Sequence, residues 1–217
     1  MTLDMFDDLE HGGLRQQALA PGALLLRGFA VADDKALLDA LRDVIAVAPF
    51  RHLVTPGGFV MSVAMSNCGA LGWVSDRSGY RYDAIDPNSG RHWPTMPAAF
   101  LRLAQDAARE AGFNRFVPDA CLINRYEPGT RLSLHQDRDE RDFEQPIVSV
   151  SLGLPAVFLF GGLRRTDKPS RVPLTHGDVV AWGGPSRLRF HGVLPIQEGH
   201  HPLLGACRIN LTFRQAA

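Results

Sequence analysis

The sequence predicts an α+β fold that is mainly β, with two helices in its first half and a β-sandwich or barrel in its second. Before Gly112, two segments carry apolar residues at the spacing of an amphipathic helix. After Gly112, short apolar or alternating segments are separated by glycine and proline, as at Pro128-Gly129 and Gly183-Gly184. Many short strands at regular spacing are typical of β-sandwiches and barrels.

The first helix is expected from about Lys35 to Val47, where Asp33 or Asp34 can cap the N-terminus. The second is expected from Pro97 to about Ala111. Gly112 follows it as the left-handed residue that commonly ends a helix.

Between these helices, residues 49–97 are rich in glycine and aromatic side chains. Because loops on a rigid scaffold often carry recognition, this composition predicts a covering loop or lid. The whole chain, residues 1–217, is expected to be one domain. Its lid region is placed at about 49–97 and its β core at about 115–217.

The β region is expected to contain seven strands. They are Cys121–Tyr126, Leu132–His135, Ile147–Gly153, Val157–Phe160, Asp178–Trp182, Arg189–His191 and Arg208–Phe213.

Composition excludes several classes of protein. Lysine plus arginine and aspartate plus glutamate each number 23, which argues against a polybasic nucleic-acid binder. The balance is a cancellation, because residues 1–160 carry a net charge of −5 and residues 161–217 a net charge of +5. Three scattered cysteines argue against a disulfide framework and favour the cytoplasm. The acidic start lacks the features of a secretory signal, and no apolar run is long enough to span a membrane.

His135 and Asp137 are the first candidates for chemistry. Residues two apart in a strand point to the same face, so both can reach one metal ion, with His191 as the best third ligand. Two imidazoles and one carboxylate with open positions are the ligand set of non-haem Fe(II) oxygenases. The alternative is that His135 and Asp137 only pair with each other at a strand end.

The last strand alternates strictly between polar and apolar residues. Arg208, Asn210 and Arg214 share its polar face, and periodicity alone favours placing that face in solvent. The alternative turns the face into a barrel, where two arginines would bind a dicarboxylic acid. Asn124 and Tyr126 share a face of another strand and could add neutral hydrogen bonds. A keto acid such as 2-oxoglutarate would use both the possible Fe(II) triad and the arginine-rich polar face.

Longer motifs resemble the AlkB family of Fe(II)/2-oxoglutarate-dependent nucleic-acid dealkylases, over about residues 22–216. They are TPGG at 55–58, MSVAMSNCG at 61–69, LGW at 71–73, DACLINRY at 119–126, LSLHQD at 132–137, PIVSVSLGLPA at 146–156, HGDVVAWGG at 176–184 and RINLTFRQ at 208–215.

The resemblance implies a double-stranded β-helix (jelly-roll) with supporting helices and a nucleotide-recognition lid. It implies Fe(II) bound by His135, Asp137 and His191. It also implies that 2-oxoglutarate is held by five residues: Asn124, Tyr126, Arg208, Asn210 and Arg214.

The resemblance further implies that a damaged base is flipped into the pocket, between Trp73 and His135, with Asp139 facing its amine or positive charge. Further residues match the nucleotide-binding surface: Thr55, Met61, Met65, Ser66, Tyr80, Arg131, Ser133 and Arg165. From spacing alone, the two methionines are more often core, Trp73 and Tyr80 can pack within the lid, and Asp139 lies in a charge run typical of a solvated loop.

The function so implied is DNA repair, by oxidative demethylation of 1-methyladenine and 3-methylcytosine. O2 would be the second co-substrate, and the products would be formaldehyde, succinate and CO2. Single-stranded DNA is the preferred substrate, duplex DNA or RNA are others, and the protein is expected to be a monomer without membrane contact. The alternatives are a related dioxygenase acting on a protein or small molecule, a non-enzymatic binder and a zinc hydrolase.

Overall fold

Two antiparallel sheets form most of the computed structural model, which describes residues 15–217; the acidic N-terminal stretch lies outside this range. The large sheet has the order β1-β2-β12-β9-β14-β7-β4-β3. Its strands are β1 (Arg15–Ala20), β2 (Ala23–Arg27), β12 (Val179–Trp182), β9 (Ile147–Gly153), β14 (Arg208–Arg214), β7 (Ala120–Tyr126), β4 (Val60–Gly69) and β3 (Arg51–Val54).

The small sheet has the order β11-β10-β13-β8, and a separate hairpin pairs β5 with β6. Its strands are β11 (Ser170–Leu174), β10 (Ala156–Phe160), β13 (His191–Val193) and β8 (Leu132–His135), and the hairpin joins β5 (Gly72–Asp76) to β6 (Gly79–Asp83). The helices are α1 (Asp34–Val47) and α2 (Ala98–Glu110).

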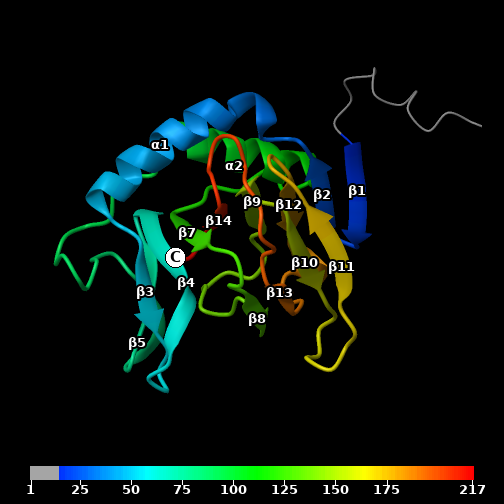
Figure 1. The fold of residues 1–217 in the computed structure, drawn as a ribbon. Coiled ribbons are helices and arrows are strands. Elements are labelled where there is room, and N and C mark those ends of the chain that lie inside the picture. The colour runs from blue at the N-terminus through cyan, green and yellow to red at the C-terminus, as the bar shows by residue number, and fades with distance from the viewer. Residues whose placement is uncertain (1–14) are drawn as a thin grey trace, which may run out of the picture.

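The large sheet is covered on both faces. Figure 1 shows α1 and α2 lying along one face, where their apolar stripes pack against buried residues such as Ile209, Leu211 and Phe213. A second apolar cluster, which includes Phe158 and Trp182, lies on the other face, toward the small sheet. Two packed antiparallel sheets with helical support are the jelly-roll expected from the resemblance.

Both helices lie where the sequence predicts them. Gly112 has a φ of +88°, and its amide donates to the carbonyl of Arg109 while that of Phe113 donates to Ala108. These two bonds are those of a Schellman motif, so the expected helix stop is confirmed. In the described part of the chain, no helix combines the length and apolarity needed to cross a membrane.

The predicted strands are confirmed with small shifts, except one. The strand expected at Arg189–His191 begins only at His191, because the amide of Arg189 donates to the carbonyl of Ser186 in a turn and Phe190 bonds Gly161 and Gly162 beyond the end of β10. The strands β1, β2 and β11 were not predicted from the sequence. β11 contains Pro173 and has solvent-exposed residues, so its periodicity is weak.

The expectation that residues 49–97 form a covering loop is wrong for its first half. β3 and β4 extend the large sheet, and β4 pairs with β7 in a register that places Met65 opposite Asn124. The glycines lie mostly at the ends of strands and in turns, so they mark the boundaries of strands in a sheet. The role of this segment as a lid remains a prediction.

We expect Gly69→Ala to destabilise the protein more than Gly79→Ala. Both glycines have a positive φ, +121° and +127° respectively, so either substitution costs about 1–3 kcal/mol in backbone strain. A Cβ at Gly69 would also lie 2.3 Å from the carbonyl oxygen of Asp119, whereas a Cβ at Gly79 meets nothing within 4 Å. Urea denaturation measures the difference. Equal losses for the two variants would contradict the steric argument.

Candidate metal and co-substrate site

A cavity of about 540 Å³ lies between the two sheets. Its wall includes residues from β4, β7, β8, β13 and β14 together with the β5–β6 hairpin. His135, Asp137 and His191 are among its lining residues, as are Arg208 and Arg214. The fold therefore brings both sequence-predicted groups, the metal triad and the arginine pair, to one space.

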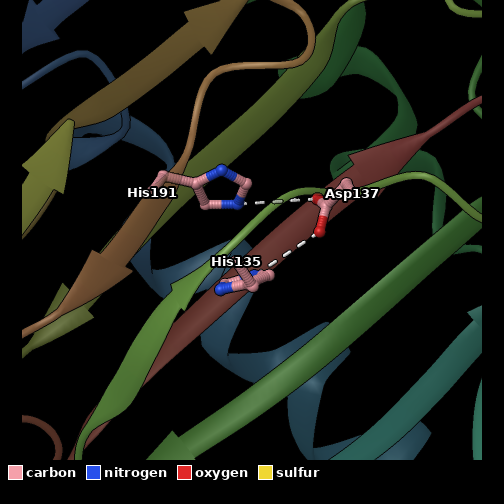
Figure 2. Close-up of side chains that lie close together, drawn as sticks. All are labelled: His135, Asp137 and His191. Carbon is pink, nitrogen blue, oxygen red and sulfur yellow. Dashed lines mark ion pairs between the residues drawn. The ribbon is translucent and has the colours of Figure 1, made fainter. Parts of the chain in front are cut away.

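Pairing of β8 with β13 assembles the metal triad. His135 lies directly opposite His191 in the register of these strands, and their ring centroids are 4.3 Å apart. Asp137 follows β8 by two residues, and its carboxylate lies 3.5 Å from His135 Nε2 and 3.7 Å from His191 Nε2. One ligand atom from each residue lies within 4.8 Å of the others, so one ion can contact all three. Figure 2 shows the carboxylate facing both imidazoles.

Main-chain carbonyls set the orientation of both imidazoles. His135 Nδ1 lies 2.8 Å from the oxygen of Ser133, and His191 Nδ1 lies 3.1 Å from that of Arg189. A carbonyl oxygen only accepts, so each Nδ1 carries the proton of the neutral ring. The lone pair then remains on Nε2, the atom that faces Asp137. This is the tautomer that metal-binding histidines adopt.

Burial and neighbouring charges act differently on the three ligands. Burial disfavours the charged form of His135, but the contact with Asp137 outweighs it and raises the pKa of this ring. Burial, together with the proximity of His135, lowers the pKa of His191 to about 4, so this ring is neutral at pH 7. Burial opposes ionisation of Asp137, but Arg214 and the two histidines outweigh it and hold its pKa well below the usual range. A neutral imidazole beside an ionised carboxylate suits Fe(II).

The polar face of β14 is buried, which corrects the solvent placement that periodicity alone favours. Arg208, Asn210 and Arg214 are 1%, 7% and 6% exposed. Their face points to the space between the sheets, while the apolar face packs under the helices. The alternation is the same in both placements, so only the presence of the second sheet decides between them.

Several buried polar atoms near Arg208 lack a protein partner. Within residues 15–217, no hydrogen bond satisfies Arg208 Nε, Arg208 Nη1, Tyr126 Oη or Asn124 Oδ1. Arg208 donates only through Nη2, to Ser151 Oγ at 3.0 Å. Burial lowers the pKa of Arg208, as expected for a cation without a carboxylate partner. Buried orphan donors beside a metal triad fit a carboxylate of a keto acid.

Arg214 lies at the metal end of the same strand. Its Nε donates to Asp137 Oδ2 at 2.9 Å and lies 3.2 Å from Glu140 Oε1. Burial disfavours its charge, but Asp137 and Glu140 outweigh this and raise its pKa. Arg214 is therefore a fixed cation beside the triad.

The residues assigned to base binding by resemblance line the cavity, with two exceptions. The cavity wall includes Thr55, Met61, Met65, Trp73, Tyr80, Arg131, Ser133 and Asp139. Trp73 stacks on Tyr80 at a centroid distance of 5.5 Å, and its Nε1 donates to Asp139 at 2.7 Å.

Arg165 is one exception, because it is exposed on the β10–β11 connection and is not part of the cavity wall. Its guanidinium lies 5.9 Å from the ring centroid of Phe190. Ser66 is also outside the wall, since it is buried and donates to the carbonyl of Ala48.

Sequence reasoning missed several residues of the site. Ser149 and Ser151 bond Asn210 and Arg208 from β9, and their alternation within an apolar strand was a usable signal. Glu140 and Arg187 form a buried ion pair of 2.9 Å. Nothing in the sequence signals the burial of this pair, since Glu140 lies in a charge run typical of a solvated loop.

Comparison with known proteins agrees with this geometry. Residues 22–214 match the 2OG-Fe(II) oxygenase superfamily, so the fold and site define an Fe(II)- and 2-oxoglutarate-dependent dioxygenase that uses O2. The chain is 57% identical to "Alpha-ketoglutarate-dependent dioxygenase AlkB" of Escherichia coli (strain K12), over 99% of this chain and 98% of that protein. It is 58% identical to the protein of the same name from Salmonella typhimurium, over 99% and 98% respectively.

A solved structure, "The structure of OsALKBH1", superposes with a TM-score of 0.80 and 32% sequence identity, covering 93% of this chain and 100% of that one. The protein belongs to the AlkB family, as its motifs predict.

Proposed function

We propose that this protein is a nucleic-acid dealkylase that oxidatively demethylates N-alkylated bases, with 1-methyladenine and 3-methylcytosine as substrates. One observation carries the proposal: the His-Asp-His triad and the unpartnered atoms of Arg208 share one cavity whose mouth is aromatic. Proteins similar to this chain include "Nucleic acid dioxygenase ALKBH1" of Homo sapiens, which is 35% identical over 59% of this chain and 34% of that protein.

His135, Asp137 and His191 would hold Fe(II) through the two Nε2 atoms and the carboxylate. Fe(II), when bound with 2-oxoglutarate and O2, supplies the oxidation that hydroxylates the N-alkyl group and turns the keto acid into succinate and CO2. The hydroxylated group then leaves as an aldehyde, which is formaldehyde for a methyl group. Arg189 and Ser133 keep the imidazoles in the metal-binding tautomer through their carbonyls.

The polar faces of β7 and β14 would bind 2-oxoglutarate. Arg208 would pair with the carboxylate far from the metal, since its buried Nε and Nη1 have no partner within residues 15–217 and can donate to carboxylate oxygens. Arg214, beside Asp137, would face the end near the metal. Asn124, Tyr126 and Asn210 would supply neutral hydrogen bonds; the first two have free buried oxygens.

The base would enter at the mouth of the cavity, between Trp73 and His135. In this structure Trp73 stacks on Tyr80, so both aromatic faces already line the entrance. Thr55, Met65 and Ser133 would contact the nucleotide from strands β3, β4 and β8 and their turns. Arg165, which lies outside the cavity wall, would contact the phosphate backbone of the substrate.

Single-stranded DNA is the proposed main substrate, since an alkylated ring nitrogen is inaccessible in a duplex and single strands need no unpairing. Duplex DNA or RNA would serve less well. We further propose a monomer in the cytoplasm, with residues 49–97 acting as the nucleotide-recognition lid.

The direct test supplies an oligonucleotide containing 3-methylcytosine, with Fe(II), 2-oxoglutarate and O2. We expect formaldehyde, succinate and the unmodified base in equal amounts, and no product without the keto acid or O2. Formaldehyde formed without the keto acid would disprove the mechanism. Succinate production that never depends on the oligonucleotide would favour a protein or small-molecule substrate.

We expect Asp139→Asn to discriminate between two lesions that carry the methyl group on the same ring nitrogen. Asp139 lines the cavity mouth, where its charge favours the cationic 3-methylcytosine over the neutral 3-methylthymine. The variant should lose about tenfold in kcat/KM for 3-methylcytosine, equivalent to about 1.4 kcal/mol. It should change little for 3-methylthymine. An equal loss for both lesions would point to the lost geometry of the Trp73 bond.

A further inference from the structure

Arg187 is buried beside the metal triad without belonging to it. Its side chain is 3% exposed and makes three polar contacts: Nε donates to the carbonyl of Gln145, Nη1 donates to that of Asp137, both at 3.0 Å, and Nη2 lies 2.9 Å from Glu140 Oε2. Its guanidinium also lies 5.5 Å from the ring centroid of Phe143. All four contacted residues lie in the segment 137–145.

Arg187 itself comes from the segment that leads into β13, four residues before His191. Gln136, the residue before Asp137, adds a second link between the two segments, because its Nε2 donates to the carbonyl of Leu188. The two segments thus carry different metal ligands, Asp137 on one and His191 on the other. The side chain of Arg187 joins them by three of its nitrogens.

The charges around this link are balanced. Asp137 and Glu140 contribute two negative charges, and Arg187 and Arg214 contribute two positive charges, all largely buried. Arg214 contacts both carboxylates. Of the two carboxylates, Arg187 contacts only that of Glu140. A cation at Asp137 would compete with Arg214, which can remain paired through Glu140 Oε1 at 3.2 Å. Tyr82 donates to the same oxygen at 2.7 Å and helps to fix it.

We infer that Arg187 is a positioning residue for metal binding: it fixes the main chain at Asp137 and neutralises Glu140, so that the Asp137 carboxylate is held at the distance from His191 that one ion requires. This inference rests on the proposed role of the triad. A metal ligand held by such outer contacts binds its ion more tightly, and loss of an outer contact typically costs 10–100-fold in affinity.

The test measures metal binding itself, with Mn(II) as a stand-in for Fe(II) that is stable in air. Free Mn(II) is quantified by electron paramagnetic resonance during titration of the full-length protein without keto acid. We expect R187M to weaken Mn(II) binding by about 10–100-fold. R187K keeps the charge but not the three-pronged contact, and should give an intermediate loss.

A double variant separates positioning from stability. R187M alone leaves the Glu140 charge buried with Arg214 as its only cationic partner, which is destabilising. R187M/E140Q removes that charge and should recover thermal stability. The contact to the carbonyl of Asp137 is still absent, so Mn(II) affinity should stay low. Recovery of wild-type affinity in the double variant would overturn the inference, and this variant carries the test where R187M does not fold.

Arg51 offers a matched control outside the cavity wall. Its side chain also lies over an aromatic ring, that of Trp93, and it pairs with a buried carboxylate, that of Asp86, at 2.6 Å. R51M should bind Mn(II) as the wild type does, and an equal loss in R51M and R187M would contradict a specific role. H135A tests the triad: if it binds Mn(II) like the wild type, the proposed metal site itself is wrong. If R187M binds Mn(II) like the wild type and H135A does not, the metal site stands and the inference about Arg187 alone fails.

Discussion

Asp137→Ala should lower turnover to about one thousandth of the wild-type rate or less, equivalent to at least about 4 kcal/mol of transition-state stabilisation. The carboxylate is the one oxygen ligand of the triad, and its two oxygens face the two imidazoles at 3.5 and 3.7 Å. Without it, two histidines remain, and a ligand set of two imidazoles holds Fe(II) weakly. Succinate and formaldehyde formation measure the loss.

The fold of this variant should survive. Arg214 loses its contact with Asp137 but keeps Glu140 Oε1, so no isolated buried cation is created. Circular dichroism should be unchanged, and the substrate oligonucleotide should still bind. Asp142→Ala is the matched control: Asp142 lies in the same loop and accepts a hydrogen bond from the amide of Glu144 instead of facing the triad. More than a tenth of wild-type turnover in Asp137→Ala would remove Asp137 from the metal site.

The sequence predicts this site well where chemistry and periodicity act together. His135 and Asp137 are two apart on a strand, so their common face follows from strand geometry alone. His191 is different: it lies on β13, opposite His135 on β8, and the pairing of those strands is a tertiary property. Residue type made it the best third ligand, and the resemblance made the choice specific.

Burial of polar residues is what periodicity cannot predict. The alternation of β14 gives the two faces correctly, but whether Arg208 and Arg214 meet water or a second sheet depends on the strands that pack opposite. Glu140 is the clearest example, since it lies beside Asp139 and Arg141 in a charged run and yet is 6% exposed. Its burial depends on Arg187, Arg214 and Tyr82, which come from three other parts of the chain.

Glycine content misleads in a similar way. Residues 49–97 have the composition of a loop, yet Gly69 and Gly72 allow close approach of neighbouring backbone and of the Trp93 ring. Close approach and loop flexibility both need glycine, so composition does not separate them.

Replacing Arg208 with methionine should weaken 2-oxoglutarate binding while making the ligand-free protein more stable. Arg208 is 1% exposed, and its Nε and Nη1 have no partner within residues 15–217. Tyr126 lies beneath it, with the guanidinium 5.0 Å from the ring centroid. A buried cation without a counter-ion is costly, so an apolar side chain of similar length relieves that cost. The apparent melting temperature should therefore rise in the variant.

Affinity should change in the opposite direction. Loss of one partner of a buried charge pair costs about 2–5 kcal/mol, so the KM for 2-oxoglutarate should rise by about 30-fold or more. The ligand 2-oxobutanoate, which lacks the second carboxylate, should bind wild type and variant alike. This comparison separates loss of the ion pair from general damage to the cavity.

Arg27→Met gives the matched control, since Arg27 is ion-paired to the buried Asp178 at 2.8 Å and is not part of the cavity wall. That variant should be destabilised, because it leaves the Asp178 carboxylate without its cation, and it should keep its KM for 2-oxoglutarate. The two variants should thus give opposite results. Arg27→Met should lose stability and keep its affinity for 2-oxoglutarate, and Arg208→Met should gain stability and lose that affinity. A KM within threefold of wild type in the Arg208 variant would show that the unpartnered guanidinium does not bind the keto acid.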